Sequence, residues 1–387
     1  MKLKTIKDYD LNNKRVIIRL DLNVPMENGQ ITDDTKIKES LATIEYAYQH
    51  NAKVILMSHL GRVKEEKDKL TSSLEPVSKK LSKLLNKEVK FSKETSGANL
   101  KNMVDNMNNG EILLIENTRF EDIDNKKESS CNLELSRYWA SLGDIFINDA
   151  YGSAHRAHAS NVGIANLLPN GIGFLVEKEL TKINTFLEED THPYIVIMGG
   201  KKVEDKIKII ENLITKCDKL IIGGAMSYTF LKVKGYNVEN NIIDENSIDF
   251  CHSMLNKYKD KIVLPIDVTT ENGQNISLEN LNGQIGFDIG IKSQELFKET
   301  LSNAKRVIIN GPLGMFEKKP FDQGTKSIYQ FLIDNNIKTI IGGGDTAASA
   351  VALGFKDKFY HISTGGGATL EYLEGKTLPG ISVINNE

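Results

Sequence analysis

The chain has 387 residues, which exceeds one ordinary hydrophobic core and predicts two domains. Hydrophobic residues make up 40% and charged residues 26%, a core-forming composition that excludes an intrinsically disordered chain. The formal net charge of −3 excludes general attraction to nucleic acid or to an acidic membrane, so any anion site must be a local cluster. No apolar run approaches the ~20 residues of a membrane span, and the N-terminus lacks the apolar stretch of a signal peptide.

The cysteines and arginines carry further information. Cys131, Cys217 and Cys251 are odd in number and far apart, which predicts neither disulfides nor a metal site and favours a reducing cytoplasm. Only seven of the 49 basic residues are arginines, so arginine is expected where a planar fork of donors binds phosphate or carboxylate. The alternative is drift in base composition, with a few arginines left by chance.

Short runs of apolar, β-branched residues recur along the chain, with helical patterns between them. They predict strands at 15–20, 53–57, 112–115, 145–148, 194–198, 219–222, 261–264, 306–310 and 338–341. Continuous apolar runs are typical of parallel strands buried on both faces, so we predict an α/β fold with doubly wound sheets. Nine strands exceed one sheet of usual size, which again predicts two domains. The loop at 166–173, followed by an amphipathic helix at 174–189, predicts where the boundary between them lies.

In the N-terminal half, polar residues follow four predicted strands. They lie in segments 19–25, 58–62, 116–119 and 148–158, which hold four arginines and three histidines. The carboxyl ends of parallel strands meet at one edge of a sheet, so these segments predict a positive site for a small phosphorylated acid. Single members of these segments have alternative explanations. Asp21 and Asn23 could cap a turn, and His59 could be a hydrogen-bonded histidine at a strand end. His155 and His158 could bind zinc as a pair, although no further ligands are suitably spaced.

In the C-terminal half, neither a P-loop nor a dinucleotide fingerprint is present. Instead, glycine clusters follow successive strands, at 199–206, 223–226, 310–317, 342–346 and 363–368. Glycine lets a ligand approach the backbone, and a glycine-rich loop that opens a helix presents N–H groups to phosphate. We therefore predict a nucleotide site in which residues 342–346 open a helix from Ala347 and Asp345 meets nucleotide-bound Mg²⁺.

Two lysines and one glutamate extend this prediction. Lys202 and Lys206 are four residues apart and share a face if a helix starts there, from which they could reach adjacent phosphates. In a chain with 42 lysines, the alternative is a solvated charged surface. Glu317 is placed to accept a hydrogen bond from a ribose hydroxyl.

These segments, in this order, resemble phosphoglycerate kinase over essentially the whole chain. The motifs are Arg19-Leu-Asp-Leu-Asn-Val-Pro25, Ser58-His-Leu-Gly-Arg62, Glu116-Asn-Thr-Arg119 and the segments 148–158, 199–206, 310–317, 343–346 and 363–368. The resemblance implies two Rossmann-like domains joined by a helix and hinge around a central cleft. It places 3-phosphoglycerate on residues 1–172 plus about 373–387, and nucleotide on residues 173–372.

The implied reaction is reversible phosphoryl transfer from 1,3-bisphosphoglycerate to ADP, giving 3-phosphoglycerate and ATP in glycolysis, by a cytoplasmic monomer that uses Mg²⁺. The implied substrate-binding residues are Arg19, Asp21, Asn23, Lys36, His59, Arg62, Arg119, His155, Arg156 and His158. The implied nucleotide-binding residues are Gly200, Lys202, Lys206, Gly223, Gly224, Asn310, Pro312, Glu317, Gly343, Gly344, Asp345 and Thr346, with Asp345 also at the metal. The implied catalytic residues are Lys36, Lys202, Gly343 and Gly366.

Three positions depart from the family pattern. Lys201 stands where alanine is usual, Ala225 where glycine is usual, and Lys36 where the family carries an arginine that stabilises the transferring group. Lys36 favours the alternative hypothesis of a catalytically weakened sensor of phosphometabolites or nucleotides on the same fold. A further alternative, an unrelated dehydrogenase, conflicts with the missing dinucleotide fingerprint.

Overall fold

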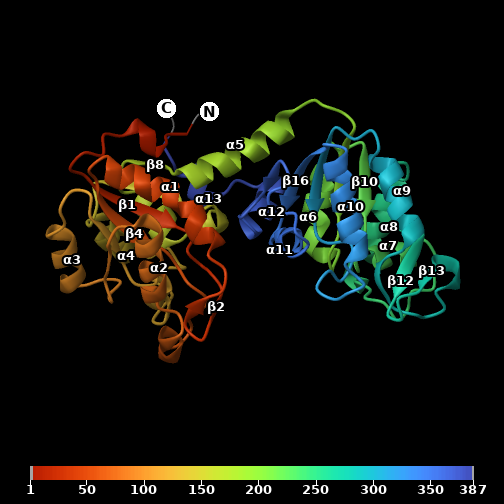
Figure 1. Ribbon diagram of the computed structural model, residues 1–387, viewed down its shortest axis with the longest axis horizontal. Helices are drawn as coiled ribbons and strands as arrows, with labels where there is room; N and C mark the ends of the chain where they lie inside the picture. The colour runs from red at the N-terminus through yellow and green to blue at the C-terminus, as the bar shows by residue number, and fades with distance from the viewer. Residues whose placement is uncertain (1–2, 386–387) are drawn as a thin grey trace. The chain divides into compact units, whose positions relative to one another are not determined.

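The computed structural model describes residues 3–385, which divide into two compact units (Figure 1). Unit 1 contains the described residues up to Thr181 and those from Thr377 on, and unit 2 contains Lys182–Lys376. The division therefore falls inside helix α5 (Phe174–Glu188) instead of at residue 172, and the chain re-enters unit 1 at Thr377 instead of at 373.

Unit 1 is built on a six-stranded parallel sheet with the order β5-β6-β4-β1-β7-β8. Its strands are β1 (Arg15–Leu20), β4 (Lys53–Met57), β5 (Val89–Phe91), β6 (Ile112–Leu114), β7 (Ile145–Asp149) and β8 (Asn170–Ile172), and a separate hairpin pairs β2 (Met26–Glu27) with β3 (Gln30–Ile31). Its helices are α1 (Thr35–Gln49), α2 (Glu75–Leu85), α3 (Ala98–Asp105), α4 (Leu133–Ala140) and α13 (Pro379–Ser382).

The sheet of unit 1 is buried on both faces, which explains its continuous apolar strands. Val16 and Ile18 of β1 pack in the core that α1 and α2 cover, whereas Ile17 packs in the core formed with α3 and α4. The C-terminal residues tie into this unit, because the Gly380 amide donates to the Ala154 carbonyl at 2.8 Å and Asn148 Nδ2 donates to the Gly380 carbonyl at 2.8 Å. The C-terminal segment is thus anchored beside the end of β7.

Unit 2 has a second six-stranded parallel sheet, with the order β11-β10-β9-β15-β16-β17, and a three-stranded antiparallel sheet with the order β13-β12-β14. Its strands are β9 (Tyr194–Met198), β10 (Lys219–Ile222), β11 (Ile262–Val263), β12 (Asp267–Thr270), β13 (Asn275–Ser277), β14 (Gly286–Ile289), β15 (Arg306–Asn310), β16 (Lys338–Gly342) and β17 (His361–Ile362). Its helices are α6 (Ile207–Ile214), α7 (Ser227–Val233), α8 (Ile248–Lys257), α9 (Ile291–Leu301), α10 (Gln323–Asp334), α11 (Gly344–Ala352) and α12 (Gly367–Leu373). Alternate residues of β9 and β15, such as Ile195 and Ile309, pack in a core with α9, α10 and α11.

Most predicted strands are confirmed, and the differences have physical causes. The loop expected at 166–173 contains strand β8, because pairing with β7 overrides the turn preference of Asn170 and Gly171. Helix α11 begins at Gly344, three residues before the expected Ala347, since Gly343 at φ 93° serves as its N-cap. The helix at 174–189 is confirmed as α5, one residue shorter.

Candidate active site

In unit 1, the carboxyl ends of four adjacent strands, β6, β4, β1 and β7, bring the predicted anion-binding segments together. We call this group the anion patch; it comprises Arg19, Asp21, Asn23, Lys36, His59, Arg62, Arg119, His155, Arg156 and His158. These residues come from five places in the sequence. The parallel sheet therefore assembles the site, as expected for ligands at strand carboxyl ends.

Asp21 and Lys36 form an ion pair within the anion patch. Lys36 Nζ, at the start of α1, donates to Asp21 Oδ2 at 2.8 Å, and the side chains are 34% and 7% exposed. Burial raises the pKa of Asp21, but the charge and hydrogen bond of Lys36, together with the hydrogen bond from the Asn23 amide, outweigh it, so the pKa lies below its usual value. Lys36 thus reaches into the patch through Asp21 and remains partly exposed.

Asn23 and the residues after β6 shape the loops of the patch. Asn23 Oδ1 accepts from the Gly61 amide at 2.8 Å, which holds the turn that precedes Arg62. The Asn117 side chain joins the β4 and β6 ends, since its Nδ2 donates to the Leu60 carbonyl at 2.7 Å and its Oδ1 accepts from the Arg119 amide at 3.1 Å. Asn117 was not predicted as a site residue, although it lies in a motif that the sequence singled out.

Three arginines of the patch lie close to one another without full compensation. Arg62 and Arg156 are exposed, and Arg119 is partly exposed. The Nε of Arg119 is buried and has no hydrogen-bond partner among the described residues. Burial lowers the pKa of Arg119, and repulsion from the Arg156 charge lowers it further. This excess of positive charge suits an anion with several oxygens.

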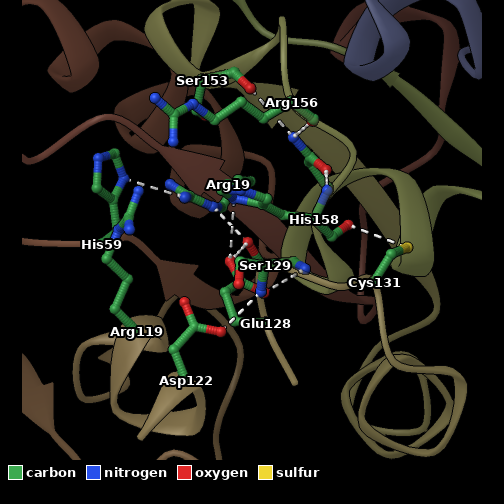
Figure 2. A network of polar contacts seen from close by, with 12 residues as sticks. Arg19, His59, Arg119, Asp122, Glu128, Ser129, Cys131, Ser153, Arg156 and His158 are labelled. Atoms are coloured by element: carbon green, nitrogen blue, oxygen red, sulfur yellow. Dashed lines mark hydrogen bonds and ion pairs between the residues drawn. The ribbon is translucent and has the colours of Figure 1, made fainter. Parts of the chain in front are cut away.

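Arg19 and His158, which Figure 2 shows in one polar network, are buried more deeply than the sequence suggested. Arg19 is fully buried, so its guanidinium lies beneath the exposed members of the patch and not among them. His158 is 5% exposed and takes part in the N-terminal capping of the helical turn η5 (Ala159–Gly163). Burial, followed by the charges of Arg19 and Arg119, lowers the pKa of His158 to about 3, so the ring is neutral near pH 7. No group of three metal-ligating side chains occurs in residues 3–385, and the zinc alternative has no support there.

In unit 2, the loops after β9, β10, β15 and β16 surround a cavity of about 400 Å³, here called the nucleotide pocket. Five predicted residues line it: Gly200, Gly224, Pro312, Glu317 and Asp345. The loops stack backbone on backbone, because a Cβ on Gly199 would lie 2.2 Å from the Pro312 carbonyl oxygen. Only glycine permits this approach.

The apolar wall of the nucleotide pocket was not predicted from the sequence. It includes Tyr228, Ile242, Val268, Ile285, Phe287, Leu313 and Met315. Much of it belongs to the β12–β14 sheet and the segments around it. The Asn272-Gly273 pair between β12 and β13 was an available hairpin signal. An apolar lining with a few polar groups is typical of a site for a small-molecule ligand or cofactor.

The remaining predicted nucleotide residues lie at or near the same strand ends but do not line this cavity. Lys206 Nζ donates to Asn310 Oδ1, and Asn310 Nδ2 donates to the Gly342 carbonyl at 2.8 Å. Burial lowers the pKa of Lys206, although the charges of Asp205 and Asp345 oppose this. Thr346 Oγ1 accepts from the Gly311 amide at 2.6 Å, so this hydroxyl fixes a loop.

Lys202 and Lys206 do not share a helix face. Residues 204–206 form the short 3-10 turn η6, and α6 starts only at Ile207. Lys202 is exposed, whereas Lys206 is partly buried. Gly223 and Gly344 lie at the end of β10 and the start of α11, and Gly343 and Gly366 are the N-caps of α11 and α12, with positive φ angles of 93° and 50°.

An anion patch on one parallel sheet and a nucleotide pocket on another define a nucleotide-dependent kinase of a small anionic substrate. The phosphoglycerate kinase family model matches residues 6–376. A phosphoglycerate kinase of Fusobacterium nucleatum is 51% identical, with 99% of this chain and 100% of the relative covered, and one of Enterococcus faecalis is 50% identical with both chains fully covered. The chain belongs to the phosphoglycerate kinase family.

Solved structures agree with this assignment. The phosphoglycerate kinase structure from Coxiella burnetii superposes with a TM-score of 0.88 at 36% identity, covering 98% of each chain. The one from Pyrococcus horikoshii gives a TM-score of 0.85 at 29% identity, again with 98% of each chain covered. The activity is thus phosphoryl transfer between 1,3-bisphosphoglycerate and ADP, as the sequence predicted, and the sensor alternative is not supported. None of the described helices is both long and apolar enough to span a membrane.

Proposed function

We propose that the anion patch binds 3-phosphoglycerate and the acyl-phosphate end of 1,3-bisphosphoglycerate. The observation that carries this assignment is the incompletely compensated charge around Arg119: its buried Nε has no partner in the described chain, and its charged neighbours include Arg156 and Arg62 as well as Asp122 and Glu128. Arg62, Arg119 and Arg156 bind the phosphate and carboxylate oxygens, because guanidinium forks match both groups. Asp21 accepts the hydrogen bond from the substrate hydroxyl, and Asn23, whose Oδ1 is used by the Gly61 amide, donates to the substrate through Nδ2.

The nucleotide pocket takes ADP or ATP. The base lies against the apolar wall, Glu317 accepts from a ribose hydroxyl, and the phosphates extend toward the amino end of α11, where backbone N–H groups favour negative charge. Lys206 neutralises phosphate charge from its tethered position beside Asn310. Gly200 and Gly224 add no side chain to the pocket lining, and Pro312 lines it as well.

Mg²⁺ fits this pocket as part of the nucleotide. Asp345 offers one exposed carboxylate in the first turn of α11, and no cluster of three ligating side chains occurs among residues 3–385. Mg²⁺ usually keeps several waters and binds through one or two carboxylates together with substrate phosphates. The ion, when bound, neutralises phosphate charge, and Asp345 is the residue that would hold it.

The protein residues perform no covalent step in the transfer. Lys36 and Lys202 neutralise charge on the equatorial oxygens of the moving phosphoryl group, and the N–H groups at Gly343 and Gly366 help to orient it. Transfer requires both bound substrates to meet in line, so we also propose a hinge motion that excludes water. The three free cysteines suit a reducing cytoplasm, and we keep a monomer as the functional form.

A coupled assay tests this proposal. Purified protein with 3-phosphoglycerate, ATP and Mg²⁺ should form 1,3-bisphosphoglycerate, detected through its onward reduction by an added dehydrogenase. The Arg119→Ala variant should raise the KM for 3-phosphoglycerate by about tenfold or more, because it removes a charge-assisted bidentate contact. Ligand binding without turnover in the unmodified protein would instead support the sensor alternative.

A further inference from the structure

Arg19 is a buried cation whose guanidinium makes three directed hydrogen bonds within unit 1. Figure 2 shows the one that joins it to His59. Its Nε donates to Ser160 Oγ at 2.8 Å, one Nη donates to the Leu20 carbonyl, and the other lies 3.1 Å from His59 Nδ1. An arginine side chain only donates hydrogen bonds. Each of its three partners must therefore accept.

Glu128 lies behind this arginine and is also fully buried. Its Oε2 accepts from the Ser160 amide at 2.9 Å, and its Oε1 accepts from the Ser160 hydroxyl. Ser160 has one hydroxyl hydrogen, which is used toward Glu128, so its oxygen is free to accept from Arg19. Burial raises the pKa of Glu128, but the Arg19 charge and both Ser160 bonds oppose this, and two accepting oxygens are the pattern of the ionised form.

The direction of these bonds fixes the state of His59. Because Arg19 donates to Nδ1, this nitrogen carries no hydrogen, and the proton of the neutral ring must be on Nε2. Burial and the Arg19 charge lower the pKa of His59 well below its usual value, so the ring stays neutral. His59 can then offer an Nε2–H donor to an anion.

We propose that Glu128 is a positioning residue of the anion patch: through Ser160 it orients Arg19, and Arg19 holds His59 as the tautomer that donates from Nε2 to a substrate oxygen. This inference rests on the proposed role of the anion patch. It also explains why the carboxylate of Glu128 is buried. Glu128 supplies the counter-charge for Arg19, and a buried arginine without a counter-charge would be strongly destabilising. Arg19 and Glu128 thereby act on the substrate only through His59.

A purely structural role of Glu128 would predict different results. The Glu128 backbone carbonyl accepts from the Ala159 amide at 2.9 Å, so the residue also links the segment before α4 to η5. A side-chain substitution keeps this backbone link, so a purely structural role would act through the bond from the Ser160 amide to Glu128 Oε2, and its loss would reduce stability without changing the tautomer of His59. The deciding readout is therefore the ring itself.

The experiment records long-range ¹H–¹⁵N correlations of the histidine rings, with His59 assigned by its loss in His59→Gln. In the unmodified protein at pH 7, His59 should show a proton on Nε2 and none on Nδ1. Glu128→Gln replaces one acceptor oxygen by a donor and should give His59 mixed tautomer signals. Ser160→Ala breaks the chain one step later and should do the same. Both variants should raise the KM for 3-phosphoglycerate by about tenfold, with the KM for ATP changed by less than about twofold.

Glu121→Gln is the matched control. Its carboxylate also accepts from two hydroxyls, those of Thr95 at 2.6 Å and Ser96 at 2.9 Å, but neither leads to Arg19. It should leave the His59 signals and both KM values unchanged. A proton on Nδ1 of His59 in the unmodified protein would overturn the inference even if a variant failed to fold. So would unchanged His59 signals in either Glu128→Gln or Ser160→Ala. The ring readout needs no substrate, so a failure of the proposed function would show separately, in the coupled assay.

Discussion

At the scale of single residues, the anion patch combines compensated and uncompensated charge. Lys36 pairs with Asp21 at 2.8 Å, whereas Arg119 keeps an unpartnered Nε within the described chain beside the Arg156 charge. In the nucleotide unit, Lys206 is tethered to Asn310 while Lys202 is exposed. In unit 2, the tethered Lys206 suits ground-state binding of phosphate, and the exposed Lys202 is free to follow a moving charge. The two lysines of unit 2 should therefore differ in kinetics.

Lys202→Ala should lower kcat by about a hundredfold or more while changing the KM for nucleotide by only a few-fold. The proposed role places its charge where phosphoryl charge develops, and an interaction made only there lowers the barrier without changing ground-state binding. Steady-state kinetics in the coupled assay measure both constants. Lys208→Ala is the control: it removes an exposed lysine that lies on α6, and it should leave kcat and the KM for nucleotide unchanged. An unchanged kcat in Lys202→Ala would restore the solvated-surface alternative.

Lys36→Arg should be active and faster than the unmodified protein by about tenfold, or ~1.4 kcal/mol of barrier. Lysine provides a point charge, whereas arginine provides a rigid fork that can hold two phosphoryl oxygens. Lys36→Ala should lose most activity. Lys38→Ala is the control, because Lys38 is already paired with Asp34 at 2.8 Å and is 57% exposed. A silent Lys36→Ala together with an unimproved Lys36→Arg would show that Lys36 is not at the reaction centre.

At the scale of elements, the sequence predicts some strands well and others not at all. Strands β1 and β9 are continuous apolar runs buried on both faces, and periodicity alone identifies them. The edge strands β5, β8 and β17 have only two or three residues, and tertiary pairing decides them. The β12–β14 sheet was missed because its strands carry few apolar residues, and the apolar wall of the nucleotide pocket was missed with it.

The candidate site likewise contains residues that the sequence predicts and contacts that it does not. Motif positions placed Asp21, His59 and Asp345 at strand ends, and the fold brings them to those ends. The burial of Arg19 was not predictable, because its partner Ser160 is 141 positions away in the sequence. Short-range patterns carry no information on such contacts.

One element junction should respond to pH. Asp149, at the end of β7, is fully buried, and its Oδ1 accepts from the amides of Leu175 and Val176 at the start of α5. Burial raises the pKa of Asp149 to about 6, although these bonds oppose the shift. The folded protein thus holds this proton more tightly than the unfolded chain does. The contribution of Asp149 to the free energy of unfolding is largest below about pH 4 and declines as pH rises to about 6.

Asp149→Asn should abolish that decline. A displacement of the pKa from 3.8 to about 6 corresponds to about 3 kcal/mol, so the variant should gain up to about this much relative to the unmodified protein between pH 4 and pH 7. Denaturant titrations at several pH values measure it. In Asp144→Asn the stability difference from the unmodified protein should change with pH in the opposite direction. Burial raises the pKa of Asp144, but the hydrogen bonds from Arg15 outweigh burial and lower this pKa overall. The stabilisation by Asp144 is therefore lost as pH falls. A constant difference across this pH range in Asp149→Asn would contradict the assignment.

At the scale of the whole molecule, the reaction requires substrates bound to two separate units to meet. We expect small-angle X-ray scattering to give a smaller radius of gyration with 3-phosphoglycerate and a non-hydrolysable MgATP analogue together than with neither. Closure excludes water that would otherwise take the phosphoryl group. Each ligand alone serves as the control and should give a smaller change. An identical radius with both ligands at saturation would argue against hinge closure.

The central claim is that one unit binds the phosphorylated acid and the other binds the nucleotide. Calorimetric titration of Arg119→Ala and Lys206→Ala with each ligand tests it most directly. Arg119→Ala should weaken 3-phosphoglycerate binding by about tenfold or more and leave the Kd for MgADP within about twofold, and Lys206→Ala should show the reverse. If each variant weakened both ligands equally, or if Arg119→Ala affected only MgADP, the assignment of the two sites would be wrong.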